Sequence, residues 1–194
     1  QPAPFMHFSN QTLRQIVRAS IGGSRLRVIL SNAFGNAPLT IGGAHVALRE
    51  KDSTTLSGSD RTLTFSGQST IAIPAGAVLF SDPVNLLVPP LADLAVDLYL
   101  PGNTNVSSPL TLHNAALQTN YVSEAGNHAG QIALPVAATI QNWFMLSRVE
   151  VVAPSSVGAV VAFGDSITDG ARSTPDTNNR WPNHLAKRLV AQPA

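Results

Sequence analysis

The 194-residue sequence contains no cysteine and few charged residues, and each absence limits what the protein can do. Without cysteine there is no disulfide framework, no thiolate metal site and no catalytic thiol. Charged residues make up 12% of the chain, half the ~25% typical of soluble domains. A dedicated nucleic-acid binder needs a concentrated cationic surface, and the net charge of +1 disfavours that class. The 44% of hydrophobic residues can form a full core, so disorder is not expected.

Long hydrophobic runs are absent as well. The longest apolar stretch is VGAVVAF at 157–163, far below the ~20 residues that span a bilayer. We therefore expect no membrane span. The chain opens with Gln-Pro-Ala-Pro at 1–4, without the basic start and apolar h-region of a signal peptide. A start at Gln rather than Met favours a processed chain, and the location we expect is secreted or periplasmic.

Short β-like runs separated by Gly, Pro, Asn, Asp and Ser fill most of the sequence up to residue 150. This spacing is typical of a sandwich or barrel. It predicts an N-terminal antiparallel β-sandwich domain over residues 1–152, with little helix. The expected strands are 12–21, 25–31, 44–49, 61–66, 69–73, 77–81, 84–88, 94–100, 117–123 and 142–152.

Three of these runs carry sharper expectations. The runs 12–21 and 25–31 are separated by Gly-Gly-Ser, which favours a β-hairpin, although the first run also has helical spacing of its apolar residues. In 94–100, leucines and valine alternate with Ala95, Asp97 and Tyr99, which predicts one buried face and one face in water. Arg25 and Arg27 alternate with apolar residues and are expected on a solvated strand face.

The pattern of short β-like runs ends at residue 153. Ala-Pro-Ser-Ser at 153–156 is typical of a short linker. The run 157–163 is apolar on both faces, as central parallel strands usually are. A polar loop GDSITDG at 164–170 follows, and then an amphipathic helix over 180–190. Strand, glycine-bounded loop and helix together predict that residues 153–194 begin a second domain of α/β class.

The loop GDSITDG follows the carboxyl end of the expected strand, where open parallel sheets place their ligand sites. A serine on such a turn exposes its hydroxyl beside free backbone N–H groups, which is what an acyl-transfer nucleophile needs. The loop lacks the lysine of a phosphate-binding P-loop and the second glycine of the GxSxG elbow. Two other interpretations remain: Ser166 as an ordinary turn serine that caps the next segment, and Asp165 with Asp169 as ligands of a hard cation.

GDSITDG resembles the first sequence block of the SGNH, or GDSL-type, serine hydrolases, a family of esterases and lipases. The segment WPNHLAKRL at 181–189 is similar to that family's first helix. The segments SNAFGNAPLTIGGAHVALR and LTLHNAALQTNYVS resemble the accessory β domain that precedes the hydrolase domain in one bacterial subgroup. The resemblance implies a β-sandwich accessory domain followed by the start of a flavodoxin-like α/β/α hydrolase domain.

The resemblance implies that Ser166 is the nucleophile and that its own backbone N–H is one oxyanion donor. Gly164, Asp165, Asp169 and Gly170 would hold the loop, the aspartates through Asx-type hydrogen bonds. The family's remaining blocks, G-x-N-D and a late Asp-x-x-His, are absent, and the single later histidine, His184, has no Asp three residues before it. The function we expect is therefore hydrolysis of a small-molecule or glycan ester, without a cofactor, and completed by a C-terminal remainder that is continuous with this chain or cleaved from it.

The competing function is a noncatalytic β-sandwich module that binds carbohydrate. Trp143 is the candidate for sugar stacking, although a tryptophan in an apolar strand is more often a core residue. The histidines show no metal-binding spacing, so no metal site is expected. His113 and His128 flank a polar stretch that can form the rim of a neighbouring site, with ordinary strand and loop roles as the simpler interpretation.

Overall fold

The structure, a computed structural model that describes residues 5–192, is almost entirely β. One 3₁₀ turn, η1 (Thr104–Ser107), interrupts the strands, and one helix, α1 (Trp181–Val190), follows them. The strands of this part of the chain are β1 (Gln11–Arg18), β2 (Gly23–Ser31), β3 (Leu39–Ile41), β4 (Gly43–Lys51), β5 (Thr54–Thr55), β6 (Arg61–Leu63), β7 (Ile71–Ile73), β8 (Val78–Phe80), β9 (Val84–Val88), β10 (Asp93–Leu100), β11 (Leu112–His113), β12 (Asn120–Ala125), β13 (Val136–Ile140), β14 (Trp143–Phe144) and β15 (Leu146–Val151).

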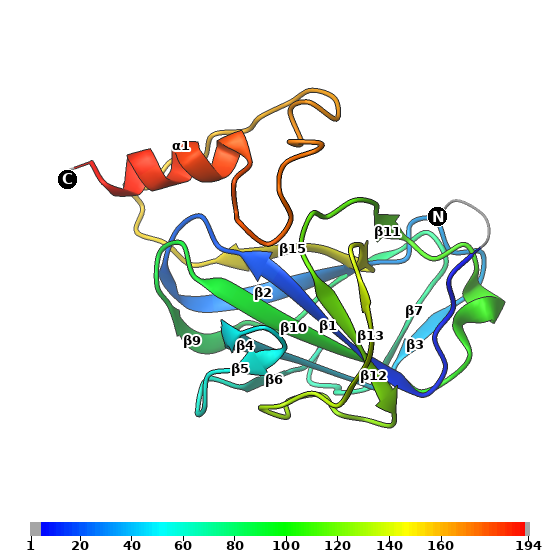
Figure 1. The fold of residues 1–194 in the computed structure, drawn as a ribbon. Helices are drawn as coiled ribbons and strands as arrows, with labels where there is room; N and C mark the ends of the chain where they lie inside the picture. The colour runs from blue at the N-terminus through cyan, green and yellow to red at the C-terminus, as the bar shows by residue number, and fades with distance from the viewer. Residues whose placement is uncertain (1–4, 193–194) are drawn as a thin grey trace.

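Two antiparallel sheets enclose the main core. The larger has the strand order β13-β12-β1-β10-β4-β5, with β6 also paired to β4, and the smaller has the order β15-β2-β8, with β9 also paired to β2. Leu13 and Leu98 from the larger sheet and Val28 and Leu30 from the smaller one are fully buried in one cluster. Figure 1 shows β2 and β15 lying across β1 and β10. This arrangement agrees with the all-β, sandwich-like content predicted for the region before residue 150.

The predicted hairpin between the first two strands is wrong. β1 pairs with β10 and β12, whereas β2 pairs with β8, β9 and β15, so the two strands lie in different sheets. Gly23, between them, allows the backbone to pass close to the backbone of Val152 and does not form a tight hairpin turn. A Cβ atom on Gly23 would lie 2.4 Å from the carbonyl oxygen of Val152, a distance that only a residue without a side chain permits.

The predicted half-exposure of β10 is also wrong, because both faces of this strand are covered. Leu94, Val96 and Leu98 belong to the main core. On the other face, Ala95 packs in a second cluster with Ile16, Tyr121 and Leu134. Asp97, expected in water, is only 3% exposed. The expectation for the outer face of β2 is confirmed, since Arg25 and Arg27 are both exposed.

The predicted fold class is contradicted after residue 152. The run 157–163 forms no strand, and its side chains face outward, with Val161 85% and Phe163 99% exposed. An apolar run becomes a strand only when a neighbouring strand accepts its backbone hydrogen bonds, and residues 5–192 offer it no such neighbour. There is consequently no flavodoxin-like α/β/α start in the described part of the chain. Whether residue 152 ends a domain stays a prediction.

The predicted helix after the loop is confirmed as α1. Pro182 lies in its first turn, where the missing N–H breaks no hydrogen bond, and Lys187 and Arg188 lie in its last turn, where cations interact favourably with the helix dipole. Figure 1 shows α1 and the segment before it outside both sheets, on one side of the β region. The helices of residues 5–192 are too short or too polar to cross a membrane, in agreement with the expectation from the sequence.

Candidate functional site

Ser166 is exposed on a loop that a network of local hydrogen bonds curls tightly. The Asp165 carboxylate accepts from the N–H of Ile167 at 2.9 Å, and the Asp165 carbonyl accepts from the N–H of Asp169 at 3.0 Å. The Ser166 carbonyl accepts from the N–H of Ala171 at 2.8 Å. These contacts fix the backbone on both sides of the serine, while its hydroxyl contacts no acceptor in the described part of the chain.

The backbone N–H of Ser166 is one of several donors in this loop that have no hydrogen-bond partner in residues 5–192. The N–H groups of Ile167, Asp169 and Gly170 each donate to an acceptor within the loop. In residues 5–192, neither the N–H nor the hydroxyl of Ser166 has a hydrogen-bond partner. A free N–H beside an exposed hydroxyl is the arrangement that an oxyanion site requires.

Two glycines allow the loop to close so tightly. A Cβ atom on Gly164 would lie 2.1 Å from Oγ1 of Thr168, so a side chain at this position would displace the loop. Gly170 has a φ of 85°, a conformation that side chains disfavour. The glycines at the two ends of GDSITDG are thus required by the loop geometry.

Asp169 attaches the loop to the β region instead of forming an Asx contact. Its carboxylate lies 3.5 Å from Nε2 of His113, on β11, and 3.3 Å from Nη1 of Arg180. The Arg180 guanidinium also donates to the carbonyl oxygens of Ala115 and Ala116. The sequence interpretation placed Asp169 within its own loop and gave Arg180 no role. Both residues connect the serine loop to the β strands.

Asp176, between the serine loop and α1, forms a second attachment. Asp176 accepts hydrogen bonds from the side chains of Gln118 and Thr119, at 2.7 and 2.6 Å, and from the Thr119 N–H at 2.5 Å. Its own N–H donates to the Leu117 carbonyl at 3.1 Å. Residues 169–180 are therefore held against the 113–119 loop of the β region by contacts that the sequence did not reveal.

No histidine of the described chain contacts Ser166. His184 is paired with Asn179 at 2.7 Å, and His128 with the carbonyl of Ala125 at 3.2 Å. His45, on β4, lies 2.9 Å from Asp60 in a pair remote in sequence from the loop. Among the described residues, no group of three or more His, Asp or Glu side chains can hold a metal ion. In residues 5–192, the exposed hydroxyl and N–H of Ser166 thus have no histidine beside them.

Trp143 lies beside the attached loop and is half-buried. Its indole N–H donates to the carbonyl of Ile16 at 2.8 Å. Its ring contacts the His113 ring, with centroids 5.3 Å apart, and the Arg180 guanidinium lies 5.9 Å from its centre. These contacts use both the polar group and the ring surface that sugar stacking would need.

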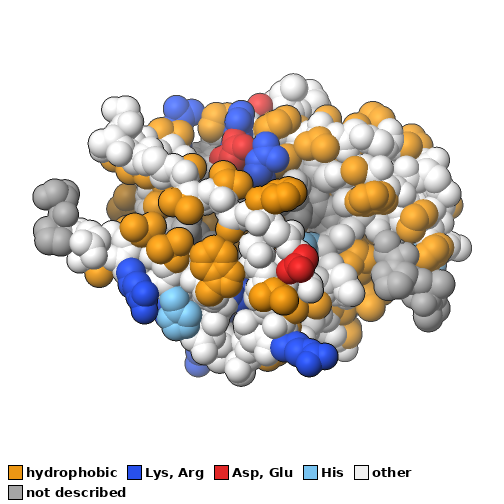
Figure 2. All heavy atoms as spheres, turned by 90° about the horizontal axis from the view of Figure 1, so that it is seen from above, with side chains coloured by type: hydrophobic (Ala, Val, Ile, Leu, Met, Phe, Trp, Pro, Cys, Tyr) orange, Lys and Arg blue, Asp and Glu red, His pale blue; other side chains and the backbone are white. Residues whose placement is uncertain are grey.

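The face that carries the serine loop is unusually apolar. Figure 2 views the molecule from this side and shows hydrophobic side chains spread across it. The exposed apolar residues of this segment are Val157, Val160, Val161, Phe163, Ile167, Trp181, Leu189 and Val190. Soluble proteins rarely leave such a group uncovered, and a patch of this kind marks a contact surface.

Neither the models of known protein families nor the curated proteins contain a match to this chain.

Proposed function

We propose that this protein is a serine carboxylic-ester hydrolase in which Ser166 is the nucleophile. The observation that carries the proposal is the geometry of Ser166, whose exposed hydroxyl and unpaired N–H lie on a loop fixed on both sides by hydrogen bonds. A structural turn serine would use its hydroxyl to cap a neighbouring N–H. This hydroxyl caps nothing among the described residues. The resemblance of GDSITDG to the nucleophile block of SGNH hydrolases supports the same role.

The reaction proceeds by acyl transfer in two steps. The Ser166 hydroxyl oxygen attacks the ester carbonyl and loses its proton to a histidine base. The N–H of Ser166 stabilises the oxyanion of the tetrahedral intermediate. The intermediate expels the alcohol, which takes the proton from the base, and leaves an acyl-serine that water then hydrolyses in the same manner. No cofactor enters this scheme. The substrate is a small-molecule or glycan ester.

The histidine base belongs to further polypeptide that covers the apolar face. Leaving Val160, Val161 and Phe163 in water forgoes roughly 1.5–3 kcal/mol for each large side chain. A polypeptide that covers them also closes over Ser166, because the exposed Phe163 and Ile167 lie before and after it in the sequence. The covering segment is either continuous with this chain or a fragment cleaved from it. We place the protein outside the cytoplasm, in the secreted or periplasmic fraction.

The competing function, a carbohydrate-binding module, has less support. Its candidate residue, Trp143, donates its N–H to Ile16 and packs its ring against His113 and Arg180. A sugar would have to displace these contacts before it could stack.

The experiment that tests the proposal compares two serine variants of the protein as isolated from its source cells. Ser166→Ala should lower turnover of short-chain nitrophenyl esters by about 10⁶-fold, the typical cost of removing a triad nucleophile. Ser156→Ala, a change at an exposed serine of the linker, should leave turnover unchanged. Near-normal turnover in Ser166→Ala would eliminate Ser166 as the nucleophile.

A further inference from the structure

β15 is an edge strand whose outer side is open. Within the described chain it pairs with β2 and has no strand on its other side. Val151 stands opposite Leu26, and Val152, just after the strand, donates its N–H to the Arg25 carbonyl at 2.8 Å. In an antiparallel ladder such hydrogen-bonded pairs alternate with unbonded ones. Because Val151 and Val149 are the first and third residues before Val152, their N–H and C=O groups point away from β2.

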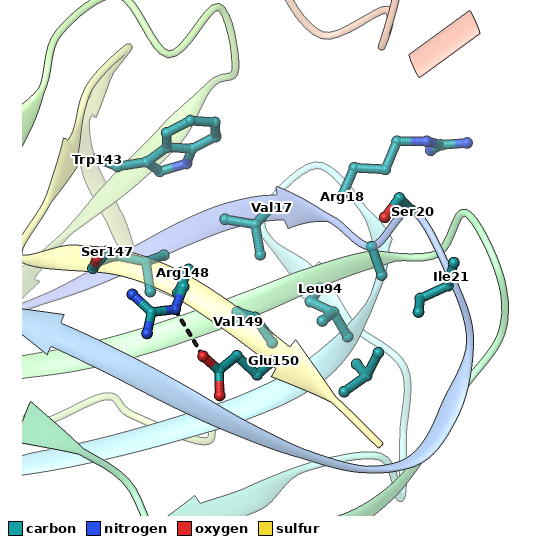
Figure 3. A pocket seen from close by; sticks show the side chains of 13 residues that line it. Val17, Arg18, Ser20, Ile21, Leu94, Trp143, Ser147, Arg148, Val149 and Glu150 are labelled. Carbon is teal, nitrogen blue, oxygen red and sulfur yellow. Dashed lines mark hydrogen bonds and ion pairs between the residues drawn. The ribbon is translucent and has the colours of Figure 1, made fainter. Parts of the chain in front are cut away.

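A cavity of 450 Å³ runs along this open edge. Every residue of β15, from Leu146 to Val151, contributes to one wall, and the end of β1 with the following turn forms the other. Figure 3 shows Val17, Leu94 and Val149 in the space between the two strands, with Trp143 at one end. Val17 and Val149 pack on the main core but remain only partly buried. The groove is thus apolar at its floor and lined by free backbone groups at its side.

The outer rim of the groove carries an excess of positive charge. The Glu150 carboxylate is shared by Arg148, at 2.8 Å, and Arg27, at 2.6 Å. Both guanidinium groups also lie over the Phe80 ring, at 5.8 and 4.9 Å from its centre. These two cations and one anion leave a net charge of +1 on the surface beside β15.

We infer that β15 binds an extended segment of a partner protein, which adds to the smaller sheet as a further strand. The free N–H and C=O groups of Val149 and Val151 bond to the backbone of that segment. Its alternate side chains are apolar and enter the groove over Val17 and Leu94. A side chain between them carries a carboxylate, which complements the unpaired positive charge beside Arg148. This inference does not depend on the proposed hydrolase activity.

The test measures fluorescence anisotropy of a labelled synthetic peptide, Ser-Glu-Val-Glu-Val-Thr-Val-Ser, titrated with the protein. Val149→Pro removes one groove-facing N–H without breaking a bond to β2, and proline is tolerated on an edge strand in this orientation. It should weaken binding about tenfold relative to Val149→Ala, which also replaces the valine side chain but keeps the N–H. Equal affinities of the two variants, both folded by circular dichroism, would overturn the inference, as would the absence of saturable binding to the unmodified protein.

A charge exchange tests the inference without altering the backbone. Arg148→Glu should weaken binding of the glutamate peptide about threefold and strengthen binding of a peptide with lysine at the glutamate positions. If Arg148→Glu changes the affinity of both peptides by the same factor, no peptide carboxylate binds beside Arg148, and the assigned partner chemistry is wrong.

Discussion

Arg14 and Asp97 stand directly opposite each other on β1 and β10 and form a buried ion pair. Nε and Nη2 of Arg14 each lie 2.7 Å from one carboxylate oxygen of Asp97. The Asp97 carboxylate also accepts from the N–H of Gly130 at 2.9 Å. The remaining N–H groups of the guanidinium donate to the carbonyl oxygens of Ser53, Gln131 and Ile132. The pair thereby attaches the 130–132 loop to the outer face of the larger sheet.

Breaking this pair from one side should destabilise the fold strongly. Asp97→Asn leaves the fully buried Arg14 guanidinium without its counter-charge, and the expected loss is about 3–5 kcal/mol in the free energy of unfolding. Urea denaturation provides the measurement. The double variant Arg14→Met, Asp97→Leu should lose less than the sum of its single changes, because no isolated charge remains buried. Additive losses would show that the two residues are not energetically coupled.

The crossing between the two sheets should depend on Gly23. Gly23→Ala places a Cβ atom 2.4 Å from the Val152 carbonyl oxygen, and the backbone shift that relieves this clash costs about 1–3 kcal/mol. Gly102→Ala is the matched control, because a Cβ atom there meets nothing within 4 Å. Its effect on the unfolding free energy should stay within about 0.5 kcal/mol. Equal effects of the two changes would contradict the close approach.

The C-terminal segment should loosen when Asp176 is removed. Asp176→Ala deletes the acceptor for Gln118 and Thr119, so amide hydrogens of 169–180 should exchange faster while those of β1 and β10 keep their protection. Hydrogen exchange read by mass spectrometry resolves the two regions. Glu50→Gln, at an exposed position on β4, should leave both rates unchanged. Uniform acceleration across the chain would mean that Asp176 supports the whole fold.

Asp82 should make part of the stability depend on pH. Hydrogen bonds from the Thr64 hydroxyl and from the backbone of Gly67 and Ser66 lower the pKa of its carboxyl below the ordinary value. A carboxyl with a lower pKa in the folded state stabilises the fold above its unfolded pKa of about 3.9, and this contribution disappears as the pH falls through the folded pKa. Asp82→Asn should therefore be less stable than the unmodified protein near neutral pH and approach it in acid. A difference that is constant with pH would contradict this assignment.

Local sequence patterns were sufficient for most strands and for α1. The strand positions followed from short β-branched and aliphatic runs between turn residues, and α1 from the spacing of Trp181, Leu185 and Leu189. Strand partners were harder to predict, because the chain passes from one sheet to the other at Gly23 instead of turning back. The alternation of residues 94–100 fits a half-exposed strand and therefore predicts Asp97 in water. Its partner Arg14 is 83 residues away.

The site was predictable only where its residues are adjacent in sequence. GDSITDG singled out Ser166 and its two glycines, whereas the contacts of Asp176 and Arg180 join residues 57 to 65 apart. Asp176 lies in a polar loop with no periodicity and Arg180 at the first position of the predicted helix, and no local signal indicates the distant partners of either residue. The run 157–163 has the composition of a buried strand, but no strand in residues 5–192 pairs with it, so composition alone gives the wrong prediction.

The most direct measurement of the central claim is covalent labelling of Ser166. The protein isolated from its source cells, with any polypeptide that accompanies it, is treated with a fluorophosphonate, digested and mapped by mass spectrometry. The account predicts one labelled peptide that carries the adduct on Ser166, and no labelling of this region in Ser166→Ala. A protein that remains unlabelled at Ser166, or that binds saccharides without any labelling, would contradict the assignment of Ser166 as the nucleophile of an ester hydrolase.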